Sequence, residues 1–263
     1  MERITSLQNP KIKNLVKLSK KKERALQNIF LLEGARELSL ALSADYIPET
    51  IFICPELFEK SEYPQVLDTL SDIPKIEVTE NVFEKIAYRE GSDGLLSLLR
   101  PKAHTLDNLN LSDNPFIIML EAVEKPGNLG AILRTADAAQ ADAVIICDPL
   151  SDIYNPNTIR SSVGCLFTTQ VAACTSDEAL LWLKNKGITT FAAELQASQW
   201  YQDTDFTKPS AVIMGAEADG LTEFWLDKAD ARIKIPMRGA IDSLNVSVST
   251  AIITFEAMRQ RGF

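Results

Sequence analysis

Residues 211–250 hold the feature that most constrains the fold of this chain, a strand and turn followed by a second strand and a helix. The first strand is expected over 211–214, an apolar run that ends at Gly215, where the chain can turn tightly, and Gly220 permits a second turn. Glu217 lies between these glycines, at the end of a strand where ligands collect in open parallel sheets. A solvated loop carboxylate is the alternative interpretation.

The second half of this segment predicts a strand over 231–235 that stops at Pro236. A helix follows, with Ser243 expected as its N-cap because a serine side chain can accept hydrogen bonds from free backbone N–H groups. Apolar residues recur along the helix at helical spacing, at Leu244, Val248, Ala251, Phe255 and Met258. This stripe would serve equally well in an intramolecular core or in a subunit interface.

An earlier segment, residues 121–149, repeats the order of strand, turn and helix. Pro126 and Gly127 are expected to close a strand, and Asn128 to open a helix. The buried face of this helix is predicted to comprise Leu129, Ile132, Leu133 and Ala136. Arg134 falls one residue beyond that face and could reach the loop end of the sheet, although an arginine so placed is more often a surface ion-pair partner.

The length of 263 residues suits two domains, each large enough to bury a core. Residues 100–114 form a polar stretch with a proline near each end, which separates two segments of α/β pattern. We expect a smaller domain over 1–102, a linker over 103–114 and a larger domain over 115–263. The smaller domain is predicted to be an α/β sandwich with strands at 30–32, 50–54, 75–78 and 95–99.

Residue usage disfavours several classes of protein and site. No apolar run approaches the roughly 18 residues needed to span a membrane, and the first residues lack the apolar core of a signal peptide. The four cysteines have no metal-ligand spacing and are expected to be reduced thiols, which indicates a cytoplasmic protein. Because His104 is the single histidine, no histidine-based metal site and no Ser/His/Asp triad is expected.

Three ordered motifs resemble those of the SpoU (TrmH-type) RNA ribose 2'-O-methyltransferases of the SPOUT superfamily. The first is the Pro-Gly-Asn-Leu-Gly sequence of residues 126–130 with Arg134, and the second is the Gly-Ala-Glu sequence of residues 215–217 with Gly220. The third is the Ser-Leu-Asn-Val sequence of residues 243–246. Three positions depart from the family pattern. Lys125 stands where the family more often has an acidic residue or asparagine, Gln140 stands where glycine is common, and Ala216 stands where asparagine is common.

This resemblance implies a C-terminal SPOUT methyltransferase domain with a parallel sheet and a deep trefoil knot, and a smaller N-terminal substrate-binding domain like ribosomal protein L30e. Topology rules alone would not propose a knot, because knots are essentially absent from protein folds. The resemblance also implies S-adenosylmethionine as methyl donor and a homodimer. Residues implied to bind the cofactor, largely through backbone groups, are Met214, Gly215, Gly220, Ile235, Met237, Ser243 and Leu244.

The implied reaction transfers a methyl group to a ribose 2'-hydroxyl, and its implied catalytic residues are Asn128, Arg134, Glu217, Asn245 and Ser247. The family's proposal that the motif arginine activates the hydroxyl falls on Arg134. A guanidinium pKa above about 12 makes arginine a poor proton acceptor, so we expect Arg134 to hold a phosphate and stabilise the developing alkoxide instead. For Ser247, packing on a helix face is the alternative interpretation.

The net charge of −9 argues against a protein that coats nucleic acid by charge alone. The charge is uneven, however, because residues 1–24 carry a net charge of +6. We expect RNA contacts there, at Lys20, Lys21, Lys22 and Arg24. The alternative is a solvated amphipathic helix that buries Ile12, Leu15 and Leu18, and both interpretations can hold together.

Two functional alternatives remain open on the sequence. Ribosomal RNA is favoured as substrate by analogy with relatives that have a separate N-terminal domain, but transfer RNA enzymes share the same motifs. A non-catalytic RNA-binding assembly factor could also retain the fold and the cofactor pocket. The presence of Asn128, Arg134 and Glu217 favours an active enzyme, because a degenerate one would be expected to lose them.

Overall fold

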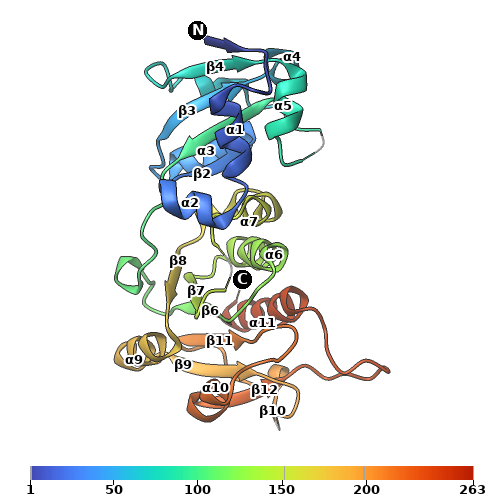
Figure 1. Cartoon of the computed structure of the whole chain (residues 1–263). Coiled ribbons are helices and arrows are strands. Elements are labelled where there is room, and N and C mark those ends of the chain that lie inside the picture. Colours follow the sequence, from blue (N-terminus) through green and yellow to red (C-terminus); the bar gives the residue numbers. More distant parts are fainter. Residues whose placement is uncertain (1, 90, 151, 198, 263) are drawn as a thin grey trace. The chain divides into compact units, whose positions relative to one another are not determined.

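The structure is a computed structural model that describes residues 2–89, 91–150, 152–197 and 199–262. It divides into two compact units, coloured by sequence in Figure 1. Unit 1 comprises Met1–Lys102 and Asp152–Thr168, and unit 2 comprises Ala103–Ser151 and Thr169–Phe263. Residues 152–168, which lie within the expected larger domain over 115–263, group with the N-terminal residues in unit 1.

Aromatic packing explains why 152–168 joins unit 1. The ring of Phe30 stacks on Tyr154 with centroids 4.3 Å apart, and Phe167 lies 6.3 Å from Phe30 on a nearly parallel plane. The hydroxyl groups of Tyr46 and Tyr154 are hydrogen-bonded at 2.7 Å. Such a buried aromatic cluster is invisible to a pattern of strands and helices, because its members are more than 100 residues apart in the chain.

Unit 1 is built on a five-stranded mixed sheet in the order β1-β4-β3-β5-β2. Its strands are β1 (Glu2–Ile4), β2 (Phe30–Glu33), β3 (Pro48–Ile53), β4 (Lys75–Val78) and β5 (Leu95–Leu99). β4 pairs in parallel with β1 and β3, whereas β5 is antiparallel to β2 and β3. All four expected strands are present. β1 was not expected, because only Ile4 of its three residues is buried and so short a strand leaves no alternating pattern in the sequence.

The helices of unit 1 are α1 (Pro10–Lys17), α2 (Lys21–Gln27), α3 (Ala35–Ser43), α4 (Pro55–Phe58), α5 (Glu80–Ile86), α7 (Pro156–Ser162) and α8 (Cys165–Thr168), with the 3-10 turn η1 (Pro64–Leu67). α1 is amphipathic as predicted, since Ile12, Leu15 and Leu18 at its inner face are each no more than 1% exposed. The Asn9 side chain caps its N-terminus by accepting a hydrogen bond from Lys11 N.

Unit 2 is built on a seven-stranded sheet in the order β10-β12-β9-β11-β6-β7-β8, with every pair parallel. Its strands are β6 (Phe116–Glu121), β7 (Ala143–Cys147), β8 (Val171–Cys174), β9 (Thr189–Ala193), β10 (Gln199–Trp200), β11 (Ser210–Met214) and β12 (Ala231–Lys234). The central strands β6, β7 and β11 are buried along their whole length, as expected for a parallel sheet covered on both faces.

Helices cover both faces of this sheet (Figure 1). The helices and turns of unit 2 are α6 (Pro126–Ala138), α9 (Ser176–Lys186), α10 (Glu223–Lys228), α11 (Val246–Arg261), η2 (Leu106–Asn108) and η3 (Tyr201–Asp203). α9 and α10 share one core with alternate residues of the strands, including Ile117 and Met119. α6 packs along α11 and buries the four residues predicted for its inner face. It begins at Pro126, two residues before the expected start.

Three of the five apolar residues in the stripe expected for the last helix do not face the core of this chain. α11 buries Val246, Thr250, Ile253, Thr254 and Ala257, whereas Leu244, Val248 and Phe255 of the expected stripe are exposed. Two threonines conceal the true inner face, because they count as polar in the sequence. Thr250 satisfies its buried hydroxyl by donating to Val246 O at 2.7 Å.

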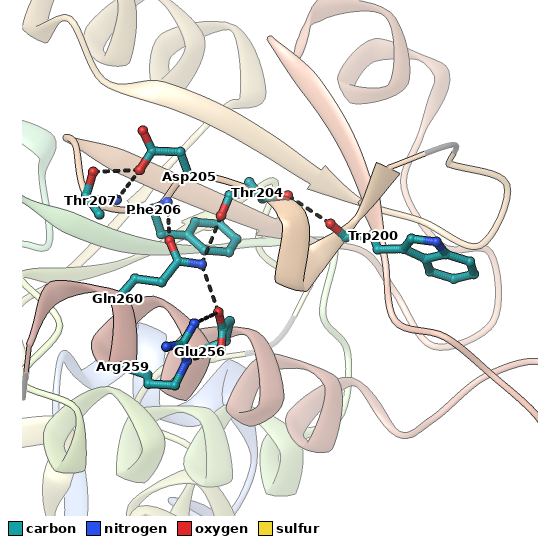
Figure 2. A network of polar contacts seen from close by, with 8 residues as sticks. All are labelled: Trp200, Thr204, Asp205, Phe206, Thr207, Glu256, Arg259 and Gln260. Carbon is teal, nitrogen blue, oxygen red and sulfur yellow. Dashed lines mark hydrogen bonds and ion pairs between the residues drawn. The ribbon is translucent and has the colours of Figure 1, made fainter.

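A polar network at the end of α11 fixes this orientation (Figure 2). The Gln260 amide accepts a hydrogen bond from Phe206 N at 2.8 Å and donates to Thr204 O at 2.9 Å, so it pairs with the backbone between η3 and β11. Glu256 accepts from both Gln260 and Arg259 at 2.8 Å. Because both edges of the Gln260 amide are bound, α11 cannot rotate about its axis without breaking these bonds.

Candidate methyltransferase site

The loop after β11 depends on two glycines. A Cβ atom at Gly215 would lie 2.2 Å from the backbone of Gly220, so a larger residue cannot stand there. Gly220 has φ +69°, in the left-handed region that favours glycine. Between them Ala216 and Gly220 exchange two backbone hydrogen bonds of 3.0 Å. This closed loop presents Glu217 at the C-terminal end of the strand, as the sequence predicted.

Asn245 is the centre of the polar cluster at this site. Its Nδ2 donates to Glu217 Oε1 at 3.1 Å and to Asn128 Oδ1 at 3.3 Å, and its Oδ1 accepts from Ser247 Oγ at 2.6 Å and from Ser247 N at 3.0 Å. Asn245, and not Ser243, is therefore the N-cap of α11. One side chain closes the helix and orients both polar residues from the other motifs.

Asn128 and Glu217 each have a further property that suits ligand binding. The Nδ2 atom of Asn128 is buried and has no hydrogen-bond partner among the residues that the structure describes. A buried donor without a partner is costly, so it is expected to find one in a bound ligand or water. Glu217 also forms an ion pair with Lys125, the N-cap of α6. In the sequence, Lys125 is notable only as a departure from the family pattern.

Arg134 lies outside this cluster. It is six residues along α6 from Asn128, about 9 Å along the helix axis and on a different face. Its side chain is exposed and makes no hydrogen bond or ion pair with the described part of the chain. The structure thus brings together four of the five catalytic candidates, and leaves the arginine on the surface of this single chain.

A cavity of 540 Å³ lies beside the cluster in unit 2. It is formed by the loops that follow β9, β11 and β12 and by the start of α11. All seven residues expected to bind the cofactor line it, namely Met214, Gly215, Gly220, Ile235, Met237, Ser243 and Leu244. Its volume is within the roughly 300–1,000 Å³ typical of cofactor sites.

A second, smaller cavity of 90 Å³ also adjoins the loop. Its walls are residues 123–125 and Asn128, at and before the start of α6, and the loop residues 216–219. The same loop residues, Glu217 among them, line the larger cavity. Two ligand groups bound in the two cavities would therefore contact one shared loop.

A further carboxylate, which the sequence motifs do not include, binds the chain just after the Gly215–Gly220 loop. Glu121 at the end of β6 is 3% exposed and accepts from Thr222 N at 2.8 Å and from Thr222 Oγ1 at 2.6 Å. A charged residue at the end of an apolar strand is the signal that would have revealed it. No group of three or more His, Cys, Asp or Glu side chains in the described ranges is placed to hold a metal ion, and no helix there is long and apolar enough to cross a membrane.

The basic residues of unit 1 separate into two kinds. Lys20, Lys21 and Lys22 are exposed at the start of α2. Arg24 is 4% exposed, and its guanidinium donates to Asp152 at 2.8 Å and to the carbonyl groups of Leu18 and Ser19. The geometry does not fit the expectation that Arg24 contacts RNA, because its guanidinium is buried and is bound to Asp152 and to two carbonyl groups within unit 1.

Comparison with known proteins identifies the family of this chain. The model of the SpoU rRNA Methylase family matches residues 115–255, and that of the MRM3-like substrate binding domain matches residues 9–97. The chain belongs to the SpoU rRNA methylase family. Family membership makes it an RNA 2'-O-ribose methyltransferase that uses S-adenosylmethionine.

Individual relatives agree with this assignment. The 23S rRNA (guanosine(2553)-2'-O)-methyltransferase RlmP of Bacillus subtilis (strain 168) is 31% identical over 97% of this chain and 98% of its own length. The tRNA (guanosine(18)-2'-O)-methyltransferase of Thermus thermophilus is 41% identical, but over 55% of this chain and 74% of its own. The AdoMet-bound rRNA methyltransferase from Sinorhizobium meliloti has a TM-score of 0.88 at 29% identity, with 98% of this chain and 97% of that chain covered.

Proposed function

We propose that this SpoU enzyme methylates a ribose 2'-hydroxyl of ribosomal RNA, with S-adenosylmethionine in the 540 Å³ cavity and the target ribose beside the 90 Å³ cavity. The observation that carries the proposal is that the Glu217 loop lines both cavities. Methyl transfer needs donor and acceptor close together, and two groups bound against one shared loop would be close. Glycine at 215 is required for this loop, because a Cβ there would clash with the backbone of Gly220.

The cofactor supplies an electrophilic methyl group on its sulfonium. Backbone groups of the loops ending at Gly215, Ile235 and Leu244 are placed to bind it, and Asn128 Nδ2 offers an unused donor toward the acceptor side. Asn245 orients Asn128 and Glu217 through its two hydrogen bonds. In this scheme all four clustered residues act by positioning, since amides and a carboxylate fixed in one network hold a reacting hydroxyl in place.

The ribose proton and the developing alkoxide need a separate group. Arg134 is the candidate, because a guanidinium can hold an RNA phosphate and stabilise negative charge while the proton passes to phosphate or water. In this chain its side chain is exposed and lies outside the Asn245 cluster. A second subunit that brings its own Arg134 to this site resolves the separation.

We infer a homodimer for this reason, with α6 and α11 at the interface. The two helices pack together, Val248 and Phe255 of α11 are 46% and 41% exposed, and Leu244, two residues before α11 begins, is 36% exposed. Apolar side chains repeated along one exposed helix face are more often covered by a partner than left in water. The orientation of that face is held by the Gln260 contacts.

The RNA substrate is inferred to be ribosomal. The B. subtilis rRNA enzyme matches the chain almost from end to end, whereas the tRNA enzyme of T. thermophilus matches little more than half of it. The part without a counterpart in that match would be the unit that carries Lys20, Lys21 and Lys22, where phosphate contacts are proposed. The name of the family model over 9–97, a substrate binding domain, supports the same role.

The remaining family expectations are part of this proposal. They are the trefoil knot in unit 2, an L30e-like fold for unit 1, domain limits at 102 and 115, and a cytoplasmic location. Intact motifs favour an active enzyme over an assembly factor, since the Asn128, Glu217 and Asn245 side chains are hydrogen-bonded in one network.

Transfer of labelled methyl from S-adenosylmethionine to ribosomal and transfer RNA, assayed separately, tests the proposal. We expect labelling of ribosomal RNA at a ribose, abolished in Glu217→Ala and retained in Glu223→Ala, an exposed carboxylate of α10 that lies outside both cavities. Labelling of transfer RNA alone would show that transfer RNA, and not ribosomal RNA, is the substrate. No labelling of either RNA, or of assembly intermediates, with the cofactor bound would favour the non-catalytic factor.

A further inference from the structure

Unit 1 contains a cavity of 220 Å³ that the methyl-transfer scheme does not use. Elements α1, β2, α3, α5, β5 and α7 contribute to its walls. The volume is below the roughly 300 Å³ at which sites for whole small molecules begin. A ligand of this site is therefore a small group, such as one side chain or one base.

The most buried polar residues of this cavity form an incompletely paired cluster. Arg89 lies between two carboxylates, with Nε 3.5 Å from Glu33 Oε1 and Nη1 3.5 Å from Glu37 Oε1. Both distances are too long for good charge-assisted hydrogen bonds, which are about 2.7–2.9 Å. Arg89 Nε and Glu33 Oε1 are buried without any hydrogen-bond partner in the described chain. One donor and one acceptor are thus left for a ligand.

The backbone is built to admit this cluster. A Cβ at Gly34 would lie 2.2 Å from Glu37 Oε2 and 2.9 Å from Arg89 Nη2, and its φ of +107° also requires glycine. Glu37 is 4% exposed, and burial is the main reason that the pKa of its carboxyl is raised. An acidic group kept in such an environment without full hydrogen bonding is unfavourable for stability alone.

The other walls and the rim have the chemistry of a nucleotide site. The walls are aliphatic, with Leu15, Val16, Leu31, Ile86, Leu96 and Ile159 among them. At the rim Lys85 and Arg160 are exposed and make no ion pair or hydrogen bond within the described ranges, and the Tyr88 ring is 50% exposed. Flat apolar walls suit the faces of a base, free cations suit a phosphate, and an exposed aromatic ring suits stacking.

We propose that this cavity binds one unpaired guanine nucleotide of the RNA substrate, separate from the nucleotide that is methylated. This inference rests on the proposed function, because it takes RNA as the substrate of the enzyme. It identifies unit 1 as the reader of an extruded base, and it assigns Glu33, Glu37 and Arg89 to the base edge. Lys85 and Arg160 take the flanking phosphate.

Guanine is the base whose edge matches the cluster. It presents an acceptor, O6, beside two donors, the N1–H and the N2 amino group. The guanidinium of Arg89 can donate to O6, while Glu33 Oε1, which has no partner in the described chain, accepts from one of the two donors and an oxygen of Glu37 accepts from the other. Adenine, cytosine and uracil each lack two adjacent donors, so this pair of carboxylates would bind only one of their groups. Inosine differs from guanosine only by the missing amino group and is the sharpest control.

Binding of GMP, IMP and AMP to the full-length protein tests this directly, by NMR titration with saturating S-adenosylmethionine present to occupy the cofactor cavity. We expect GMP to bind roughly tenfold or more tightly than IMP or AMP, the effect of one hydrogen bond to a charged group. Val16→Trp fills the mouth of the cavity and should abolish binding, whereas Leu26→Trp, at a residue 77% exposed on α2 and outside the cavity, should not. Glu33→Gln should remove the preference for GMP over IMP.

Equal affinities for the three nucleotides, or GMP binding that survives Val16→Trp, would overturn the proposal. So would tighter binding of N-acetyl-argininamide than of GMP, which would indicate a protein side chain as the occupant. The labelled methyl-transfer assay distinguishes a failure of this inference from a failure of the proposed function. Ribosomal RNA methylation without GMP selectivity defeats this inference alone, while selective GMP binding without methylation of any RNA defeats the proposed function.

Discussion

Asn245 and Glu217, 28 residues apart in the chain, are joined by a hydrogen bond of 3.1 Å from Nδ2 to Oε1. The same Asn245 side chain caps α11 through Ser247 N. The position of a catalytic-loop carboxylate is therefore coupled to the start of the last helix. A residue that serves both purposes can be tested for each one separately.

Asn245→Ser should separate capping from catalysis. Serine is also a good N-cap, so the variant should unfold within about 2 °C of the wild type, whereas Asn245→Ala should lose about 1 kcal/mol, or about 2–4 °C in Tm. Both variants lose the bonds to Asn128 and Glu217, and both should lose methyl transfer by roughly 100-fold or more. Thermal melts and kcat measurements check this. Full activity in Asn245→Ser would show that the amide only caps the helix.

The proposed dimer can be tested through Arg134. Arg134→Ala and Glu217→Ala should each be inactive alone. If the arginine serves the partner's site, a mixture of the two should regain activity, because one site of each heterodimer then has both residues. Subunits exchanged under mild denaturation and assayed together provide the measurement. A mixture that remains as inactive as its parts would place Arg134 in the site of its own chain.

Charge on the exposed face of α11 should dissociate the dimer. Val248→Glu places a carboxylate on a face that is 46% exposed in the single chain, and burying that charge at an interface would be strongly unfavourable. We expect a shift from dimer to monomer in sedimentation velocity and a loss of methyl transfer. Leu181→Glu is the matched control, since Leu181 is 63% exposed on α9. Identical sedimentation of both variants would contradict the interface.

Charge reversal of the α2 lysines should weaken RNA binding. Lys20→Glu, Lys21→Glu and Lys22→Glu together should reduce affinity for ribosomal RNA, and the slope of log affinity against log salt should become shallower by about 2–3. A control triple of exposed lysines elsewhere, Lys60→Glu, Lys184→Glu and Lys228→Glu, changes the net charge equally. Equal effects of the two triples in filter binding at several salt concentrations would indicate that total charge, and not this site, controls binding.

His104 should make the protein less stable in mild acid. Its ring is half-buried and hydrogen-bonded at 3.0 Å to Val171 O, and desolvation by burial is the main cause of its lowered pKa. The folded state therefore binds fewer protons than the unfolded state, whose histidine titrates near about 6.5. Stability from this group is complete above that pH and decreases as the pH falls below it. Tm measured from pH 8 to pH 5 should fall less in His104→Asn than in the wild type.

Local pattern was sufficient for much of this molecule. The strands β4 and β5 and the inner face of α6 follow from alternation and from helical spacing, and glycine at 215 and 220 predicted the tight loop. These features depend on neighbours within a few residues, which is the range over which periodicity and turn chemistry act. The three ordered motifs were sufficient to indicate the family.

Tertiary structure decided the features that depend on distant partners. Arg24 resembles its neighbouring lysines in sequence, but Asp152 and two backbone carbonyl groups bury it. The outward stripe of α11 resembles a core stripe until the Gln260 contacts fix the rotation of the helix. The sequence by itself determined which side chains and turns were present, but only the folded chain determined which of them meet, because burial and pairing are set by residues far apart in sequence.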